Sequence, residues 1–149
     1  MSLDVDVAAE NVRVPLSRDA VRRAAIVVLR AERVRHALVS ITFLDKRAMA
    51  RLNKSHLGHA GATDVISFGF TRAAEADPVV GDIYICADVA REHARERHVG
   101  IREELARLVI HGVLHILGHD HPTDDDRETS PMWKRQERLV GRVIRSQAR

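Results

Sequence analysis

The sequence has very few aromatic residues, a single cysteine and no long hydrophobic segment. Aromatic residues make up 3% of the 149 residues, and the one cysteine is Cys86. A single cysteine forms no internal disulfide, which fits the reducing environment of the cytoplasm. So few scattered rings also argue against a stacking platform for bases, such as many single-strand binding proteins use.

The chain contains no apolar run of about 18 residues, the length at which a segment becomes a candidate transmembrane helix. Its first residues lack the basic and apolar regions of a secretory signal. We therefore expect a cytoplasmic protein with no membrane segment. A hydrophobic content of 45% and a charged content of 30% are ordinary for a globular protein. The length predicts one domain over residues 1–149.

Formal net charge is +3, which favours a polyanionic partner such as RNA. Because aromatic residues are scarce, contacts with RNA are expected mainly at the phosphate backbone and through arginine.

The most informative stretch is residues 111–121, HGVLHILGHDH, which holds four of the nine histidines. On a helix, His111 and His115 lie one turn apart on the same face, so both rings reach one ion. Gly118 is typical of the residue that ends a helix, and beyond it His121 supplies a third nitrogen. Three neutral imidazoles leave one tetrahedral position for water, as in catalytic zinc sites. The spacing predicts a metal site at these three histidines.

The motif also allows a different ligand set and suggests what the site does not do. A helix that continued through Gly118 would align His119, in place of His121, with His111 and His115. The spacing matches the metzincin pattern H-E-x-x-H-x-x-G-x-x-H, except that Gly112 stands where those peptidases carry their glutamate base. The metal ligands are therefore present without the peptidase base. We expect one zinc ion per chain, with nickel as the next candidate.

The same stretch resembles H-G-x-L-H-L-x-G-Y-D-H, the signature of the YbeY family of bacterial metal-dependent endoribonucleases. Ile116 and His119 differ from it. Residues 63–68, TDVISF, are similar to the family's T-[DN]-V-L-S-F, and residues 81–85, GDIYI, to its G-D-I-x-I. The family's M-x-x-x-Q-E is matched by Met132, Gln136 and Glu137.

We expect an α+β fold, with a small mixed sheet of about four strands packed against helices and the metal-binding helix at the centre. The resemblance implies a zincin-like arrangement. It also implies metal-dependent cleavage of single-stranded RNA, serving ribosomal RNA maturation and ribosome quality control at the small ribosomal subunit. Two other functions would use the same residues. A small zinc metallopeptidase needs a carboxylate base near residue 112, and a non-catalytic ribosome-assembly factor with a structural metal needs a fourth ligand, for which His119 is the nearby candidate.

One segment departs from the family pattern. The family carries Tyr-Arg where this chain has His56 and Leu57, and its arginine is taken to contact substrate phosphate. Either Lys54 or His59, both on a loop predicted over residues 54–62, replaces that cation, or phosphate binding is weaker.

Several polar residues have more than one interpretation. His119 and Asp120 are candidates to move a proton, and Asp120 is equally a candidate to orient a ligand histidine. Asp82 is either a turn or strand-end residue or, by resemblance, a neighbour of the metal cleft. Glu104 shares the helical stripe of His111, two turns away. It is either an acceptor for a histidine ring N–H or, as the expected role, part of a surface salt bridge. A row of basic residues on one helix, expected as a solvated face rather than an RNA track, is formed by Arg91, Arg95 and His98.

Periodicity and capping residues predict the elements in chain order. These are a strand over 3–7, a helix over 17–30 capped by Ser17, a strand over 37–44, a helix over 46–53, strands over 64–70 and 79–86, helices over 88–98 and 101–117, and a last helix opened by Ser130 and Pro131.

Overall fold

The computed structural model of the chain describes residues 1–120, 128 and 130–147. Within these residues, four strands form one mixed sheet in the order β1-β2-β4-β3. The strands are β1 (Ser2–Glu10), β2 (His36–Leu44), β3 (Val65–Phe70) and β4 (Val79–Cys86). The helices are α1 (Arg18–Ala31), α2 (Lys46–Leu57), α3 (Ala87–Arg97), α4 (Ile101–Ile116) and α5 (Pro131–Gln147). The predicted α+β fold with a four-stranded mixed sheet is confirmed.

Local sequence explains where two of the helices begin. Ser17 precedes α1, and its Oγ accepts a hydrogen bond from the Ala20 N–H at 3.1 Å. Ser130 Oγ accepts in the same way from the Trp133 N–H at 3.2 Å. Pro131 is then the first residue of α5, where a missing N–H costs nothing. Both predicted helix starts are confirmed.

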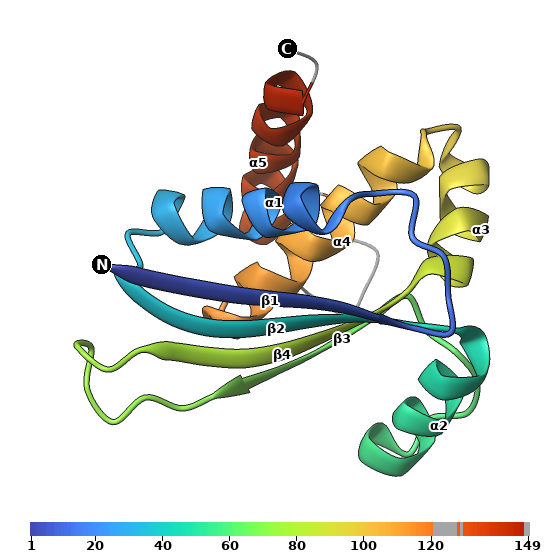
Figure 1. The fold of residues 1–149 in the computed structure, drawn as a ribbon, viewed down its shortest axis with the longest axis horizontal. Helices are drawn as coiled ribbons and strands as arrows, with labels where there is room; N and C mark the ends of the chain where they lie inside the picture. Colours follow the sequence, from blue (N-terminus) through green and yellow to red (C-terminus); the bar gives the residue numbers. More distant parts are fainter. Residues whose placement is uncertain (121–127, 129, 148–149) are drawn as a thin grey trace.

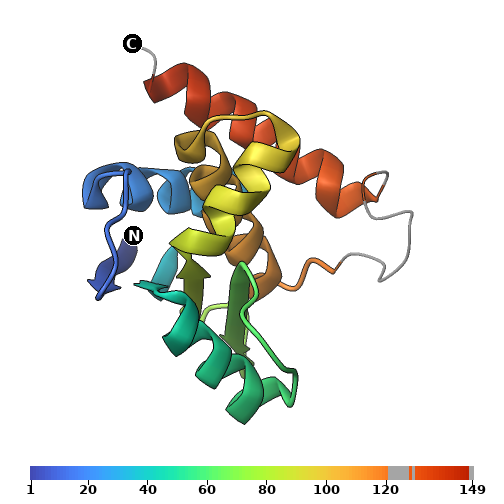
Figure 2. The ribbon, with the colours of Figure 1, turned by 90° about the vertical axis from the view of Figure 1, so that its right-hand side faces the viewer.

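The sheet has parallel and antiparallel pairs. β1 pairs with β2, and β2 with β4, in parallel, whereas β3 is an antiparallel edge strand beside β4. Figure 1 shows α1 and α4 on one face of the sheet and α2 on the other. In the view of Figure 2, nearly along the strands, α5 packs on the far side of α4 from the sheet. Helix α4 is thus the central element, and every residue from 104 to 114 is buried. No helix among the described residues is both long and apolar enough to cross a membrane.

Glycines let α4 lie close against the sheet. A Cβ added to Gly112 would lie 2.8 Å from Ile83 Cγ2, and one added to Gly81 would lie 2.5 Å from Ile116 Cδ1. A Cβ on Gly69 would meet the Ile116 carbonyl oxygen at 3.2 Å. The C-terminal half of α4 is therefore seated directly on β3 and β4.

The prediction of a helix over residues 46–53 followed by a loop was wrong at its C-terminal end. Helix α2 continues to Leu57 and ends at Gly58, whose φ of 70° is the left-handed conformation that glycine adopts readily. The polar residues after Asn53 form the exposed last turn of the helix. Lys54 therefore lies on α2, and only His59 lies in the loop that follows.

Neither predicted interpretation of Asp82 holds. The residue lies in the middle of β4, and Ser40 Oγ donates a hydrogen bond to its Oδ1 at 2.6 Å. Because side chains alternate along a strand, Asp82 points to the face opposite that of Ile83, which packs against α4. It is neither a strand-end residue nor on the helix side of the sheet.

Candidate metal centre

His111 and His115 lie side by side on α4, as the spacing predicts. Their ring centroids are 4.6 Å apart, and the ring planes are inclined by 72°. His111 is 6% exposed, and His115 is partly exposed at the C-terminal end of the helix. Two imidazole nitrogens can therefore be offered to one ion. His121, the third predicted ligand, lies outside the described residues.

His119 does not join this pair. Helix α4 ends at Ile116, and Gly118 turns the chain with a φ of 96°. The His119 Nε2 then contacts the Glu32 carboxylate just beyond the end of α1. Within the described part of the chain, no three histidine, cysteine or acidic side chains gather closely enough to hold a metal ion. The alternative set of His111, His115 and His119 is not assembled in this structure.

Glu32 also binds Arg135 of α5. Arg135 Nε donates to Glu32 Oε2 at 3.1 Å. Burial by itself would raise the pKa of Glu32, but the hydrogen bonds and charges of Arg135 and His119 outweigh it and hold the pKa below its ordinary value. An ionised Glu32 thus anchors the segment that follows α4 to both α1 and α5.

Asp120 stands next to the second histidine. Its Oδ1 lies 3.8 Å from His115 Nδ1, which is within ion-pair range but longer than a hydrogen bond. The Asp120 side chain is 93% exposed. This position is compatible with either predicted role, orienting His115 or accepting a proton, and both stay predictions.

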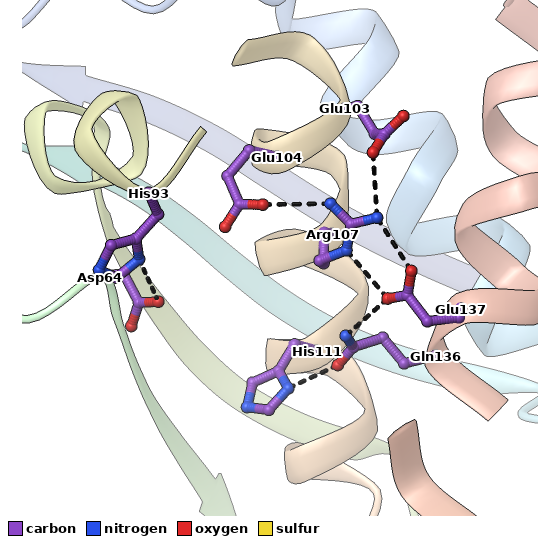
Figure 3. A network of polar contacts seen from close by, with 8 residues as sticks. All are labelled: Asp64, His93, Glu103, Glu104, Arg107, His111, Gln136 and Glu137. Carbon is purple, nitrogen blue, oxygen red and sulfur yellow. Dashed lines mark hydrogen bonds and ion pairs between the residues drawn. The ribbon is translucent and has the colours of Figure 1, made fainter. Parts of the chain in front are cut away.

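The first histidine has a buried partner on α5. His111 Nδ1 and Gln136 Oε1 are 2.6 Å apart, and a dashed line marks this contact in Figure 3. An acceptor at Nδ1 favours the tautomer whose proton is on Nδ1 and whose lone pair is on Nε2. Metal-binding histidines characteristically donate their other ring N–H in this way. The residues described here therefore fit a metal ion, as far as two of its three predicted ligands are concerned.

One turn before His111, Arg107 lies among three carboxylates (Figure 3). It contacts Glu103 and Glu104 at 3.1 Å and both oxygens of Glu137 at 2.9 Å. Glu104 does form a salt bridge, with Arg107, but its predicted location at the surface was wrong, because the Glu104 side chain is only 3% exposed. The stripe of α4 that carries Glu104 is covered by neighbouring helices, which helical periodicity alone does not reveal. Burial raises the pKa of the Glu104 carboxyl above its ordinary value.

Sequence reasoning did not single out a cation that the structure places near His111. A cavity of about 30 Å³ beside His111 is also lined by Arg97 and Trp133. The Arg97 guanidinium lies 5.3 Å from the centre of the Trp133 ring. Arg97 is not part of the basic row that was predicted on this helix. The sequence pointed to it only through the general richness of α3 in arginine.

Lys54 and His59 are exposed and line no part of that cavity. Helix α2, which carries Lys54, covers the face of the sheet opposite α4 (Figures 1 and 2). The His56 ring near the end of α2 packs against Phe68 of β3, with centroids 5.6 Å apart. The loop after α2 leads into the edge strand that borders α4, and the phosphate-binding role of Lys54 and His59 stays a prediction.

The chain is similar to one protein family over nearly all of its length. The family model described as Endoribonuclease YbeY matches residues 5–143. A protein of that name from Bacillus licheniformis is 35% identical over 153 residues, covering 95% of this chain and 96% of its own length. One from Syntrophus aciditrophicus is 32% identical over 142 residues, covering 93% of this chain and 89% of its own length.

A structural comparison agrees on the architecture. The solution structure of a protein from Thermotoga maritima matches 97% of this chain and 91% of its own length, with a TM-score of 0.66. Sequence identity to that protein is 23%, so the likeness supports the fold alone.

Proposed function

Because the chain belongs to the YbeY family of endoribonucleases, we propose that it cleaves single-stranded RNA at the His111–His115 face of α4 with the help of one metal ion. Zinc is the first candidate and nickel the second, held by His111, His115 and His121. The proposed cellular role is ribosomal RNA maturation and ribosome quality control at the small ribosomal subunit, in the cytoplasm.

The observation that carries this proposal is the packing around Gly112. In a metallopeptidase with this motif, the corresponding residue is the glutamate that acts as general base. Here a Cβ at residue 112 would lie 2.8 Å from Ile83 Cγ2 and 3.2 Å from Ser67 Oγ. The sheet fills the place that a glutamate side chain would need. The metal-binding helix is therefore built without room for the peptidase base, and peptide hydrolysis is not favoured.

The second rival, a structural metal in a non-catalytic assembly factor, is not favoured either. Such a site is closed by four protein ligands. His119 is the nearby candidate for the fourth, and its Nε2 is directed to Glu32. That arrangement supports a metal ion with a position open to water or substrate.

The chain's own residues have separate tasks in the proposed reaction. A bound metal ion would lower the pKa of a water molecule toward about 7 and polarise a phosphate oxygen. Cations near the scissile phosphate stabilise the negative charge that grows on its oxygens. For proton transfer we assign Asp120 ahead of His119, because Asp120 is exposed beside His115 whereas His119 contacts Glu32.

Replacing the ligands tests the metal site. His111→Ala, His115→Ala and His121→Ala should each abolish stoichiometric zinc binding and RNA cleavage, because two imidazoles hold the ion far more weakly than three. His119→Ala should keep wild-type zinc content and serves as the matched control. Elemental analysis and cleavage of a labelled single-stranded RNA are the measurements. A need for His119 but not for His121 would contradict the assigned ligands.

A second set of variants tests the phosphate contact. Leu57→Arg, which restores the family residue, should raise cleavage at matched zinc occupancy. Lys54→Ala or His59→Ala should lower it, since losing one such charge-stabilising contact commonly costs about 10²-fold in rate. If none of the three changes the rate, this segment does not bind the phosphate. Arg97→Ala, beside His111, should then be the variant that slows cleavage.

A further inference from the structure

Two consecutive residues of α5 reach across to α4 and contact two residues one turn apart. Gln136 Oε1 lies 2.6 Å from His111 Nδ1, and Glu137 pairs with Arg107. Gln136 is 1% exposed and His111 is 6% exposed, so the contact between them is buried. The Glu137 side chain is 32% exposed, so its pairing with Arg107 is partly buried. The two pairs are also joined to each other, because Gln136 Nε2 donates to Glu137 Oε2 at 3.0 Å.

The hydrogen bond between Gln136 and Glu137 determines the orientation of the Gln136 amide. An ionised carboxylate only accepts hydrogen bonds, so the group of Gln136 that faces Glu137 must be its NH₂. The amide oxygen is then the atom that faces His111. An oxygen only accepts, so His111 Nδ1 must be the donor. One carboxylate therefore sets both the amide orientation of Gln136 and the tautomer of His111.

Glu137 is held ionised by Arg107. Arg107 Nε and Nη2 donate to the two carboxylate oxygens at 2.9 Å each, the bidentate geometry of a strong pair. Burial would raise the pKa of Glu137, but the hydrogen bonds and charge of Arg107 and the hydrogen bond from Gln136 hold it below its ordinary value. Arg107 is itself fixed by Glu103 and Glu104. The series of contacts from Arg107 through Glu137 and Gln136 to His111 therefore begins at a buried arginine of α4.

We propose that Gln136 is a positioning residue of the metal centre. Oriented by Glu137 and Arg107, it fixes His111 in the tautomer that has its proton on Nδ1 and offers Nε2 to the metal. This inference rests on the proposed metal site at His111. The buried partner of His111 comes from α5, whereas Asp120, 3.8 Å from His115 Nδ1, is exposed.

The consequence is a lower cost of binding the ion. A histidine whose ring and tautomer are already set loses less freedom when it becomes a ligand. Removing such a partner typically weakens metal affinity about 10- to 100-fold. Gln136→Met, which keeps the size of the side chain and removes its hydrogen bonds, should weaken zinc affinity by this factor.

Glu137→Gln separates positioning from packing. A glutamine at 137 can both donate and accept, so the Gln136 amide is no longer forced to direct its oxygen at His111. We therefore expect a mixture of His111 tautomers in metal-free Glu137→Gln and loss of the Nδ1–H preference in Gln136→Met. A purely structural role would lower the melting temperature and leave the tautomer unchanged. Arg138→Gln, exposed on the same helix, is the matched control.

The measurements are the imidazole ¹⁵N shifts of His111 in metal-free protein and the zinc dissociation constant by chelator competition. Wild-type tautomer and wild-type zinc affinity in both Gln136→Met and Glu137→Gln would overturn the proposal. If Gln136→Met does not fold, Glu137→Gln alone decides. Failure of the wild type to bind zinc would count against the proposed metal function. The nitrogen spectra, recorded without metal, would still show whether Gln136 sets the tautomer.

Discussion

At the scale of single residues, the carboxylates around Arg107 do not contribute equally to stability. Glu137 shares two hydrogen bonds with Arg107, and its pKa lies below the ordinary value. Burial places the pKa of Glu104 above the ordinary value. The ionised form is thus favoured by folding at Glu137 and penalised by folding at Glu104.

This difference predicts opposite effects of two isosteric substitutions. Glu137→Gln should destabilise the protein at neutral pH. Because the pKa of Glu137 is depressed, its contribution is complete above 4.5 and is lost as pH falls through the folded value. Glu104→Gln should be at least as stable as wild type at neutral pH, since a raised pKa penalises the native state as pH rises above 4.5.

Urea unfolding at about pH 7 and about pH 4 measures both effects, and the two variants should converge toward wild type at the lower pH. Equal losses in Glu104→Gln and Glu137→Gln at neutral pH would contradict this account. Arg138→Gln, outside the cluster, should show no such pH dependence.

Prediction from sequence succeeded where the signal is local. His111 and His115 share a helix face because they are four residues apart, and Gly118 does turn the chain after α4. The contact between His119 and Glu32 connects residues 87 positions apart. A local sequence pattern cannot reveal such a contact. Gln136 and Glu137 were visible as a motif, but their role depends on how α5 packs on α4.

At the scale of elements, the contact between α4 and the sheet depends on Gly112. Alanine favours a helix interior over glycine by about 1 kcal/mol. Overpacking a tight contact costs about 1–3 kcal/mol, and a Cβ here would lie 2.8 Å from Ile83. Gly112→Ala should therefore lower the free energy of unfolding by up to about 2 kcal/mol.

Gly141→Ala on α5 is the matched control, because the group nearest its added Cβ is the flexible end of Arg145 at 3.2 Å. This variant should gain about 0.5–1 kcal/mol from helix propensity. Denaturant unfolding compares the two. A stabilising Gly112→Ala would show that α4 can move away from the sheet at little cost.

Element boundaries show the same limit of sequence reasoning. Helix starts with a serine cap were predicted correctly for α1 and α5. The end of α2 was missed by four residues because the polar stretch after Asn53 was interpreted as loop, although the glycine suited to a left-handed cap stands at 58. Polarity marks exposure, whereas the cap marks the end of a helix.

At the scale of the whole molecule, a net charge of +3 and 3% aromatic residues predict how RNA binding responds to salt. Phosphate contacts release counterions, so the logarithm of the affinity should fall with the logarithm of salt concentration, with a slope of roughly −0.7 per phosphate. Little salt-independent affinity from base stacking is expected.

Fluorescence anisotropy of a labelled single-stranded RNA across a salt series measures this slope. His119→Ala, which keeps the protein's arginines, should give the wild-type slope. An affinity that stays constant from low to moderate salt would contradict binding through the backbone.

The burial of α4 also determines how fast its backbone amide protons exchange with solvent. Residues 104–114 are buried, and α4 packs against α1, α3, α5, β3 and β4. Amide protons in such a segment are released only when the whole domain opens. Ligand binding to the native state raises the free energy of global unfolding, and this increase is the same for every amide that exchanges through that opening. An ion bound at His111 and His115 would therefore slow deuterium uptake by one common factor along α4. That factor would report the increase in the free energy of global unfolding.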